Sequence, residues 1–278
     1  ICPTHELSIQ CYDVCGELTK YTKITKALVI GKTRVQDCIN DLRKQPQVIV
    51  GTPGRILDMI NRNELFTSKI KIIVCDEADD ILSLGFLDTI STIFRCIPPT
   101  SQVCLFSATI PLEVEDMSEK FMDNPQKILI KKEELTLDGI KQFHVMLKNY
   151  NWKYDVLMDL YDTLNITQSI IYVNSKKTLR YLYEKLVEQK FPVSHIHGEM
   201  DSKDRSNNMN NFKSGKTRIM LSTDLLARGI DIQQLSLVIN FDLPNMKDTY
   251  IHRIGRSGRY GRKGVAINLV VENETQEL

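Results

Sequence analysis

The chain has 278 residues, of which 42% are hydrophobic and 26% are charged, and its formal net charge is +1. This composition is typical of globular proteins and excludes disordered, collagen-like and mucin-like chains, while the length predicts two ordinary domains. No apolar run approaches the roughly 18 residues of a membrane span, and no basic start followed by an apolar stretch marks a signal peptide. We therefore expect a cytoplasmic protein, with the nucleus as the alternative, and no membrane partner.

The cysteines and the charges are both unevenly distributed. All seven cysteines lie within the first 104 residues, and their odd number and scatter predict reduced core thiols rather than a disulfide framework. Cys11 and Cys15 lie one helical turn apart, but no C-x-x-C motif or nearby histidine supports a metal site. Residues 1–140 carry a net charge of about −4 and residues 141–278 about +5, which favours the second half as a polyanion-binding surface. Ordinary scatter of surface charge explains this difference equally well.

Short apolar runs rich in β-branched residues alternate with amphipathic helical stretches along nearly the whole chain. The strands predicted in the first half are Ala27–Ile30, Val48–Val50, Ile72–Cys75, Val103–Phe106 and Ile128–Ile130. Those predicted in the second half are Ser169–Val173, Val193–Ile196, Ile219–Leu221, Leu237–Phe241 and Val265–Val270, with helices at Lys176–Lys190 and Lys203–Phe212. Continuous apolar runs indicate strands that are buried on both faces of a parallel sheet.

This pattern predicts an α/β fold with two parallel-sheet domains, residues 1–133 and 141–278, joined by a linker at residues 134–140. The charged stretch from Lys131 to Thr136 has no strong periodicity and marks the junction. Residue 1 is isoleucine rather than methionine, and Ile1-Cys2-Pro3-Thr4 has the character of a strand end that runs into a loop. We therefore expect the sequence to begin inside a domain.

An acidic turn follows one of the predicted strands. The apolar run that ends at Cys75 leads directly into Asp76-Glu77-Ala78-Asp79. A carboxylate at the end of a buried strand is how many nucleotide hydrolases hold Mg²⁺, and an adjacent glutamate is placed to polarise an attacking water. A solvated acidic turn that opens a helix explains the same residues.

Two further motifs lie at the ends of strands in the first half. Ser107-Ala108-Thr109 offers two hydroxyl groups that bridge neighbouring carboxylates and main chain, or that cap a helix. Thr52-Pro53-Gly54-Arg55 opens a helix whose free N–H groups, together with the arginine, form a seat for phosphate. A threonine-capped helix with proline at its first position is the alternative.

The second half carries an arginine-rich motif. Leu221-Ser222-Thr223-Asp224 closes a strand and precedes Ala227-Arg228-Gly229-Ile230-Asp231, and His252-Arg253-Ile254-Gly255-Arg256-Ser257-Gly258-Arg259 follows later. Three arginines at three-residue spacing, with glycines between them, suit the charge that spreads over a transferring γ-phosphoryl group. A nucleic-acid patch or a solvated basic loop is the alternative.

Taken together and in this order, these motifs resemble those of the DEAD-box RNA helicases. The segments Lys131–Gln142, Asp224–Asp231 and Tyr250–Asn268 are most similar to the translation initiation factor 4A group of that family. The resemblance covers essentially the whole chain. It implies two RecA-like domains that close on ATP and on single-stranded RNA, with ATP and Mg²⁺ as cofactors. It also implies translation-initiation or RNA-processing proteins as partners.

The resemblance also implies individual roles at matching positions. For catalysis, Asp76 would hold Mg²⁺ through water, Glu77 would position the attacking water, and Arg256 and Arg259 would reach the γ-phosphate. The residues that would couple the nucleotide to domain closure are Asp79, Ser107, Thr109 and His252, and Asp231 would meet the ribose of ATP. The residues that would face RNA are Pro3, Thr4, Gly31, Thr52, Gly54 and Arg55 in the first domain, and Asn174, Arg205 and Thr223 in the second. Contacts to phosphate and sugar predict RNA binding, single-stranded or duplex, that is independent of sequence.

The chain also departs from the family pattern. No G-x-x-x-x-G-K-[ST] phosphate loop and no glutamine-bearing adenine segment occur in the 278 residues. We therefore expect the first domain to lack its N-terminal strand and P-loop here, and the chain alone to hydrolyse ATP negligibly. His5 replaces the arginine of Pro-Thr-Arg-Glu-Leu, Lys32 replaces the second residue of a Gly-Gly pair, and Ser202 replaces a glutamine, which puts individual RNA contacts in doubt.

Three functions remain open at this point. The first is an ATP-dependent RNA helicase that unwinds or remodels RNA. The second is a non-catalytic RNA-binding clamp or scaffold, which the same motifs permit. The third, a DNA-directed helicase of the same superfamily, is disfavoured by Asp76-Glu77-Ala78-Asp79 together with the segments that resemble initiation factor 4A.

Overall fold

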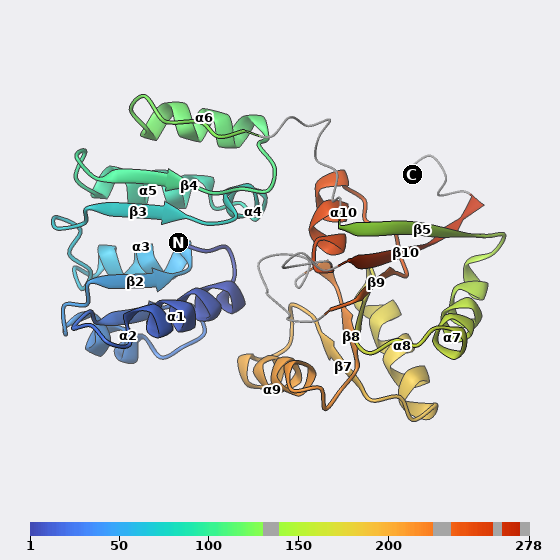
Figure 1. Cartoon of the computed structure of the whole chain (residues 1–278). Helices are drawn as coiled ribbons and strands as arrows, with labels where there is room; N and C mark the ends of the chain where they lie inside the picture. The colour runs from blue at the N-terminus through green and yellow to red at the C-terminus, as the bar shows by residue number, and fades with distance from the viewer. Residues whose placement is uncertain (130–138, 225–234, 258–262, 273–278) are drawn as a thin grey trace. The chain divides into compact units, whose positions relative to one another are not determined.

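The structure is a computed structural model, and it describes residues 1–129, 139–224, 235–257 and 263–272. The chain divides into two compact units, Ile1–Leu129 and Ile130–Leu278. Both units consist of parallel strands with helices packed against them (Figure 1), which confirms the predicted fold class. Most of the predicted linker, residues 134–140, falls outside the described residues, so its bounds stay a prediction.

Four short parallel strands form the sheet of the first unit. They are β1 (Lys26–Val29), β2 (Val48–Gly51), β3 (Ile72–Cys75) and β4 (Gln102–Leu105), and β1 pairs with β2 while β3 pairs with β4. The first two residues connect the pairs. The Cys2 N–H donates to the Gly51 carbonyl (3.0 Å), and the Ile1 carbonyl accepts from the Asp76 N–H (3.0 Å). Ile1 and Cys2 thus lie between β2 and β3, although neither belongs to a strand, so the predicted strand end is not formed as such.

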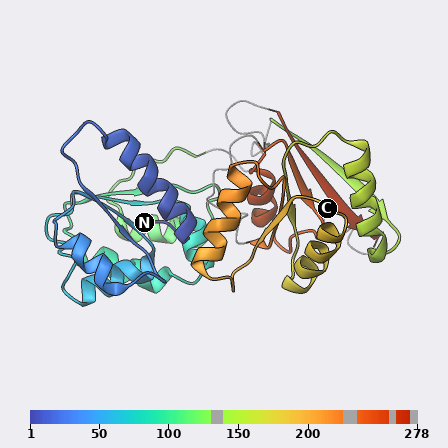
Figure 2. The ribbon, with the colours of Figure 1, turned by 90° about the horizontal axis from the view of Figure 1, so that it is seen from below.

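Helices cover the first sheet on both sides. They are α1 (His5–Thr19), α2 (Val35–Leu42), α3 (Pro53–Asn61), α4 (Ala78–Ser83), α5 (Leu87–Cys96) and α6 (Leu112–Phe121). The larger core gathers Met59, Ile73 and Ile90 from α3, β3 and α5. A smaller cluster of Cys2, Leu7 and Val50 lies where α1 packs on β1 and β2. Figure 2 shows α1, in dark blue, along one side of the first unit.

Two expectations for the first unit are wrong. Ile72 and Val74 of β3 are 58% and 39% exposed, because α1 covers this face only over β1 and β2, and no other described element covers it over β3. Ile128 and Leu129, predicted as the start of a strand, are 87% and 59% exposed and belong to no strand. Without ladder hydrogen bonds from a neighbouring strand, an apolar run alone does not form a strand.

The second unit has a six-stranded parallel sheet with the order β5-β10-β9-β6-β8-β7. The strands are β5 (Ile140–Leu147), β6 (Ser169–Tyr172), β7 (Val193–Ile196), β8 (Ile219–Ser222), β9 (Leu237–Asn240) and β10 (Gly264–Val271). The helical elements are η2 (Tyr150–Trp152, a 3-10 turn), α7 (Lys153–Thr163), α8 (Lys176–Glu188), α9 (Ser202–Lys213) and α10 (Lys247–Ile254). All residues of β6, β8 and β9 are buried, so the prediction of burial on both faces is confirmed here.

The pattern of continuous apolar runs missed β5. Its residues alternate between apolar and polar types, and most of its side chains are exposed or half-buried. Among the described strands it pairs with β10 alone, so it lies at the edge of the sheet. Edge strands bury less apolar surface than central ones, which explains why β5 lacks the signature that identified the others.

All seven cysteines are free thiols, but only Cys2, Cys38 and Cys75 are buried, so the predicted core position holds for three of them. Among the described helices, none is both long enough and apolar enough to span a membrane.

Lys32 adopts a left-handed backbone conformation, with φ of 59°, at the position where the family carries glycine. This conformation is unfavourable by roughly 1–2 kcal/mol for a residue with a Cβ atom. Glycine avoids this strain, but its greater conformational freedom in the unfolded chain offsets part of the gain in stability. We expect Lys32→Gly to raise the free energy of unfolding of the first unit by about 0.5–1 kcal/mol, as measured by urea denaturation. Lys32→Ala is the control, because it removes the side chain but keeps the strained backbone. An equal gain in both variants would show that the lysine side chain, not the backbone, is responsible.

Candidate functional site

The acidic turn directly follows β3, as predicted. Asp76 is half-buried at the carboxyl end of the strand, and its Oδ1 accepts a hydrogen bond from the Glu77 N–H (3.1 Å). Glu77 lies in the left-handed region, with φ of 52° and ψ of 57°, and immediately precedes α4. Such conformations are sparsely populated and gather at functional sites. The turn thus presents two carboxylates at the sheet edge where parallel α/β domains bind ligands.

Asp79 joins this turn to the Ser-Ala-Thr loop after β4. Its Oδ2 accepts hydrogen bonds from the Thr109 hydroxyl (2.5 Å) and the Thr109 N–H (3.2 Å), and its N–H donates to the Ser107 Oγ (3.1 Å). Asp79 and Thr109 are 7% and 8% exposed, so these bonds are sheltered from water. The Ser107 and Thr109 hydroxyl groups therefore bond Asp79 of the acidic turn. They do not cap the following helix, whose N-cap residue is Pro111. These hydrogen bonds join the two loops.

The predicted phosphate seat opens α3. Thr52 occupies the N-cap position and Pro53 the first turn, as the alternative predicts, but the Thr52 side chain makes no capping bond. A Cβ atom added to Gly54 would meet nothing within 4 Å, so the backbone there is open to a ligand. Arg55 is anchored beside it, because its Nη2 donates to the Thr33 carbonyl (3.1 Å).

The remaining RNA-facing candidates of the first unit adjoin α1. Pro3 is buried, and Thr4 is the N-cap of α1, where its hydroxyl accepts from the Leu7 N–H (3.2 Å). A Cβ atom on Gly31 would come within 3.1 Å of the His5 Nε2. Two positions where the sequence departs from the family, His5 and the Gly31-Lys32 turn, therefore lie against each other.

In the second unit, Arg253 is the centre of a buried polar network that the sequence did not single out. Its side chain is fully buried and donates to the Asp224 Oδ1 (2.6 Å), the Asn174 Oδ1 (2.7 Å) and the Asp242 carbonyl (2.7 Å). Its guanidinium carbon also lies 5.2 Å from the ring centre of Tyr172. Arg253 thus fastens α10 to the ends of β6, β8 and β9.

The candidate residues Asn174, Arg205 and Thr223 occupy strand and helix ends of this unit. The Asn174 side chain is engaged within the unit, because its Nδ2 also donates to the Leu243 carbonyl (2.6 Å). Arg205 is 7% exposed, and its Nη2 donates to the Gly198 carbonyl (3.2 Å). Thr223 is half-buried just after β8. The site roles of all three stay predictions.

Two of the arginine-motif candidates lie on or next to α10. His252 is 2% exposed and Arg256 is 5% exposed, and the Arg256 Nε donates to the His252 carbonyl (3.1 Å). The other two nucleotide candidates of this half, Asp231 and Arg259, lie outside the described residues. Their roles stay predictions.

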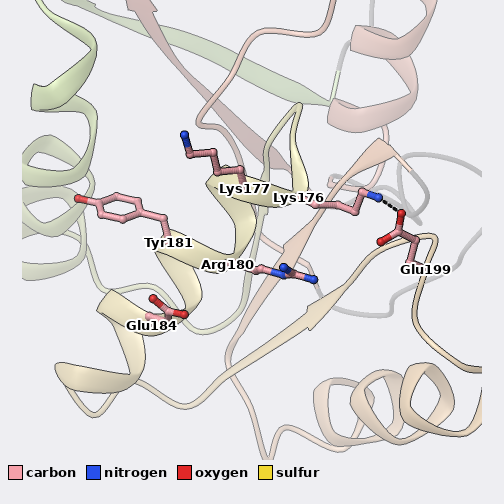
Figure 3. Close-up of a pocket in the computed structure, with 6 residues that line it drawn as sticks. All are labelled: Lys176, Lys177, Arg180, Tyr181, Glu184 and Glu199. Carbon is pink, nitrogen blue, oxygen red and sulfur yellow. Dashed lines mark hydrogen bonds and ion pairs between the residues drawn. The ribbon is translucent and has the colours of Figure 1, made fainter.

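A basic pocket of about 370 Å³ opens at the start of α8, two residues after Asn174 (Figure 3). Its lining residues are Lys176, Lys177, Arg180, Tyr181, Glu184 and Glu199. Lys176 pairs with Glu199 across the pocket, and this hydrogen bond lowers the pKa of Glu199. Burial and the nearby Arg180 lower the pKa of His197. Sequence reasoning missed this pocket, although the run of cations after Ser175 was a signal for it.

Three thiols lie close to the acidic turn. Burial raises the pKa of Cys75, at the end of β3, to about 11, so this thiol is inert. Cys2 and Cys11 lie together, with their sulfur atoms 3.8 Å apart, and hydrogen bonding from Cys11 lowers the pKa of Cys2.

One unit carries an acidic turn bonded to a Ser-Ala-Thr loop, and the other carries an arginine-rich helix end. Two parallel α/β units with these features define a helicase of the RecA-like class. Profile comparisons agree with this class. The DEAD/DEAH box helicase family matches residues 1–117, and the helicase conserved C-terminal domain matches residues 152–261. The chain belongs to the DEAD-box helicase family.

The chain is similar over its whole length to initiation factor 4A proteins. It is 51% identical over 276 residues to eukaryotic initiation factor 4A of Caenorhabditis elegans, which covers 99% of this chain and 69% of that protein. The Drosophila melanogaster protein of the same name is 50% identical over 278 residues, covering 100% of this chain and 69% of that protein. The resemblance to the initiation factor 4A group is thereby confirmed.

Solved structures share the fold. S. cerevisiae Dbp5 bound to RNA and ADP BeF3 has a TM-score of 0.91 at 39% identity, covering 100% of this chain and 72% of that chain. Mss116p bound to ssRNA and AMP-PNP has a TM-score of 0.86 at 25% identity, covering 98% of this chain and 59% of that chain.

Proposed function

We propose that this protein is an ATP-dependent RNA helicase that remodels RNA in translation initiation or RNA processing, in the cytoplasm. The observation that carries the proposal is the buried set of bonds from Asp79 to Ser107 and Thr109. This set ties the carboxylates that would act on ATP to a neighbouring loop, so that a change at the nucleotide moves both. The similarity to initiation factor 4A over the whole chain supports the same function.

In this proposal, each residue that acts on ATP has a role that follows from its charge. Asp76 holds Mg²⁺ through water, and its half-buried carboxylate at a strand end suits a hard cation that keeps part of its hydration. When bound, Mg²⁺ neutralises charge on the phosphates. Glu77 orients the attacking water, Asp231 meets the ribose, and Arg256 and Arg259 meet charge on the γ-phosphate. Coupling to RNA runs through Asp79, Ser107, Thr109 and His252.

The RNA-directed residues contact the backbone of the strand. Gly54 in the open first turn of α3 offers an N–H group to phosphate, and Thr52 offers its hydroxyl, since its own N–H donates to the Val29 carbonyl (3.1 Å). Thr4 and Gly31 lie at loops of the same unit. In the second unit, Asn174, Arg205 and Thr223 occupy strand and helix ends. Phosphate and sugar carry no sequence information, so binding is independent of base sequence. Partners from the translation-initiation or RNA-processing machinery belong to the same proposal.

RNA-stimulated ATP hydrolysis tests this function. We expect the 278-residue chain alone to turn over ATP negligibly, because its sequence contains no phosphate loop to cradle the β- and γ-phosphates. A fusion to the N-terminal segment of an initiation factor 4A relative should hydrolyse ATP with RNA and much less with DNA. RNA binding by the fusion without any hydrolysis would instead establish the clamp or scaffold.

Thr223→Ala should weaken RNA binding by the fusion roughly 10-fold, because the loss of a phosphate contact costs about 1–2 kcal/mol. Fluorescence anisotropy with a non-hydrolysable ATP analogue measures the loss on two single-stranded RNAs of unrelated sequence. Thr163→Ala on α7 is the control, since the Thr163 hydroxyl bonds only within its own helix in the described structure. The Thr223 loss should be equal for both RNAs; a strongly sequence-dependent loss would mean that this segment reads bases.

A further inference from the structure

Three residues that are distant in sequence bring metal-ligating atoms together beside the acidic turn. They are Cys2 between β2 and β3, Cys11 on α1, and Asp76 after β3. The two sulfur atoms lie 3.8 Å apart, and the two sulfurs and a carboxylate oxygen of Asp76 all lie within 4.8 Å of one another. No other role in the proposed function uses either thiol.

The spacing of the two sulfurs suits a tetrahedral metal ion. Zn²⁺ binds thiolates at about 2.3 Å, and two ligands at tetrahedral angles on one such ion lie about 3.8 Å apart. Two thiolates and one carboxylate form a donor set that selects Zn²⁺ over Mg²⁺, because thiolates are soft ligands. The fourth tetrahedral position is left for water.

The surroundings also suit such a site. Cys2 is 3% exposed and packs with Leu7 and Val50, so the floor of the site is apolar. Cys11 and Asp76 are half-buried, which leaves a path for the ion from solvent. The Glu77 N–H bonds one oxygen of the Asp76 carboxylate (3.1 Å), and such outer bonds orient a metal ligand.

We propose that Cys2, Cys11 and Asp76 bind a thiophilic divalent cation, Zn²⁺, with water as the fourth ligand. On binding, the two thiols lose their protons to solvent, and no oxidation or reduction takes place. Zn²⁺ at this site occupies the carboxylate that the proposed function assigns to Mg²⁺, so the two ions compete. This consequence for hydrolysis rests on the proposed function, whereas the binding site itself does not.

Titration of the reduced 278-residue chain with Cd²⁺, a spectroscopic substitute for Zn²⁺, tests the site. We expect a thiolate-to-metal charge-transfer band in the ultraviolet that saturates at one equivalent and is displaced by Zn²⁺. Cys2→Ser and Cys11→Ser should each abolish the one-equivalent transition, and Asp76→Asn should weaken it roughly 10-fold or more. Cys15→Ser is the matched control, because Cys15 lies one turn further along α1, outside the three-residue group; it should leave the titration unchanged.

The results of this titration decide whether the three residues bind the metal ion. An unchanged band in Cys2→Ser or Cys11→Ser would overturn the proposal, and an unchanged affinity in Asp76→Asn would remove the carboxylate from it. Circular dichroism of each variant confirms folding, and Cys11→Ala provides a second substitution if the serine disturbs the apolar floor. A Cys2–Cys11 disulfide found by mass before reduction, followed by failure of the reduced protein to bind Cd²⁺, would also overturn it. Because the titration needs neither ATP nor RNA, failure of the proposed function leaves its result unaffected.

Discussion

Arg253→Ala should destabilise the second unit by about 3–5 kcal/mol, the largest effect on stability that we expect of any substitution in this chain. The guanidinium is fully buried, so its removal leaves a cavity and an unpaired buried carbonyl at Asp242, whereas Asp224 and Asn174 are exposed and regain water. Here the Asn174 side chain, the Asp242 carbonyl and the Asp224 carboxylate all lose a donor. The single tryptophan, Trp152, lies in this unit, so urea unfolding followed by its fluorescence measures the loss.

Two variants control this experiment. Arg253→Lys keeps the positive charge but cannot supply the planar fork of donors, so it should recover less than half of the lost free energy. Arg180→Ala removes an arginine from the exposed face of α8 and should change stability by no more than about 0.5 kcal/mol. If Arg253→Ala unfolds at the same urea concentration as Arg180→Ala, the network does not stabilise the unit.

Glu77→Gln should slow ATP hydrolysis by roughly 100-fold or more in the chain fused to a relative's phosphate-loop segment, while ATP binding stays nearly intact. Glutamine matches glutamate in size and tolerates the same left-handed backbone, so the substitution removes only the base that orients water. Steady-state hydrolysis with saturating RNA and titration with a fluorescent ATP analogue measure the two quantities.

Glu115→Gln on α6 is the matched control for this substitution, because it makes the same chemical change at an exposed position outside the acidic turn. Its hydrolysis should equal that of the unsubstituted fusion. Loss of ATP binding in Glu77→Gln would show that Glu77 holds the turn together rather than acting on water.

The sequence predicted those parts of the fold and site that depend on residues close to one another along the chain. An apolar run located β3 to the residue, although one face of that strand is exposed. Another located β8 to within one residue, because a parallel strand that is buried on both faces needs apolar side chains on both. The acidic turn was found because it follows the first of these runs directly. Ser107 and Thr109 were expected to couple to it on resemblance alone, and the structure brings both to Asp79.

The parts that were missed depend on contacts between distant segments. Arg253 has the same local pattern as Arg256, and its burial is decided by partners from the ends of β6, β8 and β9, which no spacing rule reveals. The same holds for Lys153, which is fully buried with its Nζ 3.9 Å from an Asp242 oxygen, although a lysine at a helix start is ordinarily exposed. The sequence places Cys11 one helical turn from Cys15, whereas in the structure the Cys11 sulfur lies 3.8 Å from the Cys2 sulfur.

The pairing of β5 with β10 has a consequence for synthesis on the ribosome. β5 is made first among the strands of its unit, but its partner in the described sheet, β10, follows more than a hundred residues later. At 5–20 residues per second, this edge stays without its partner for roughly 5–25 seconds. During that interval, the exposed backbone and apolar side chains such as Phe143 and Met146 are a target for chaperones and for pairing with another nascent chain. Among the described strands, the last to emerge is therefore the one that pairs with the first.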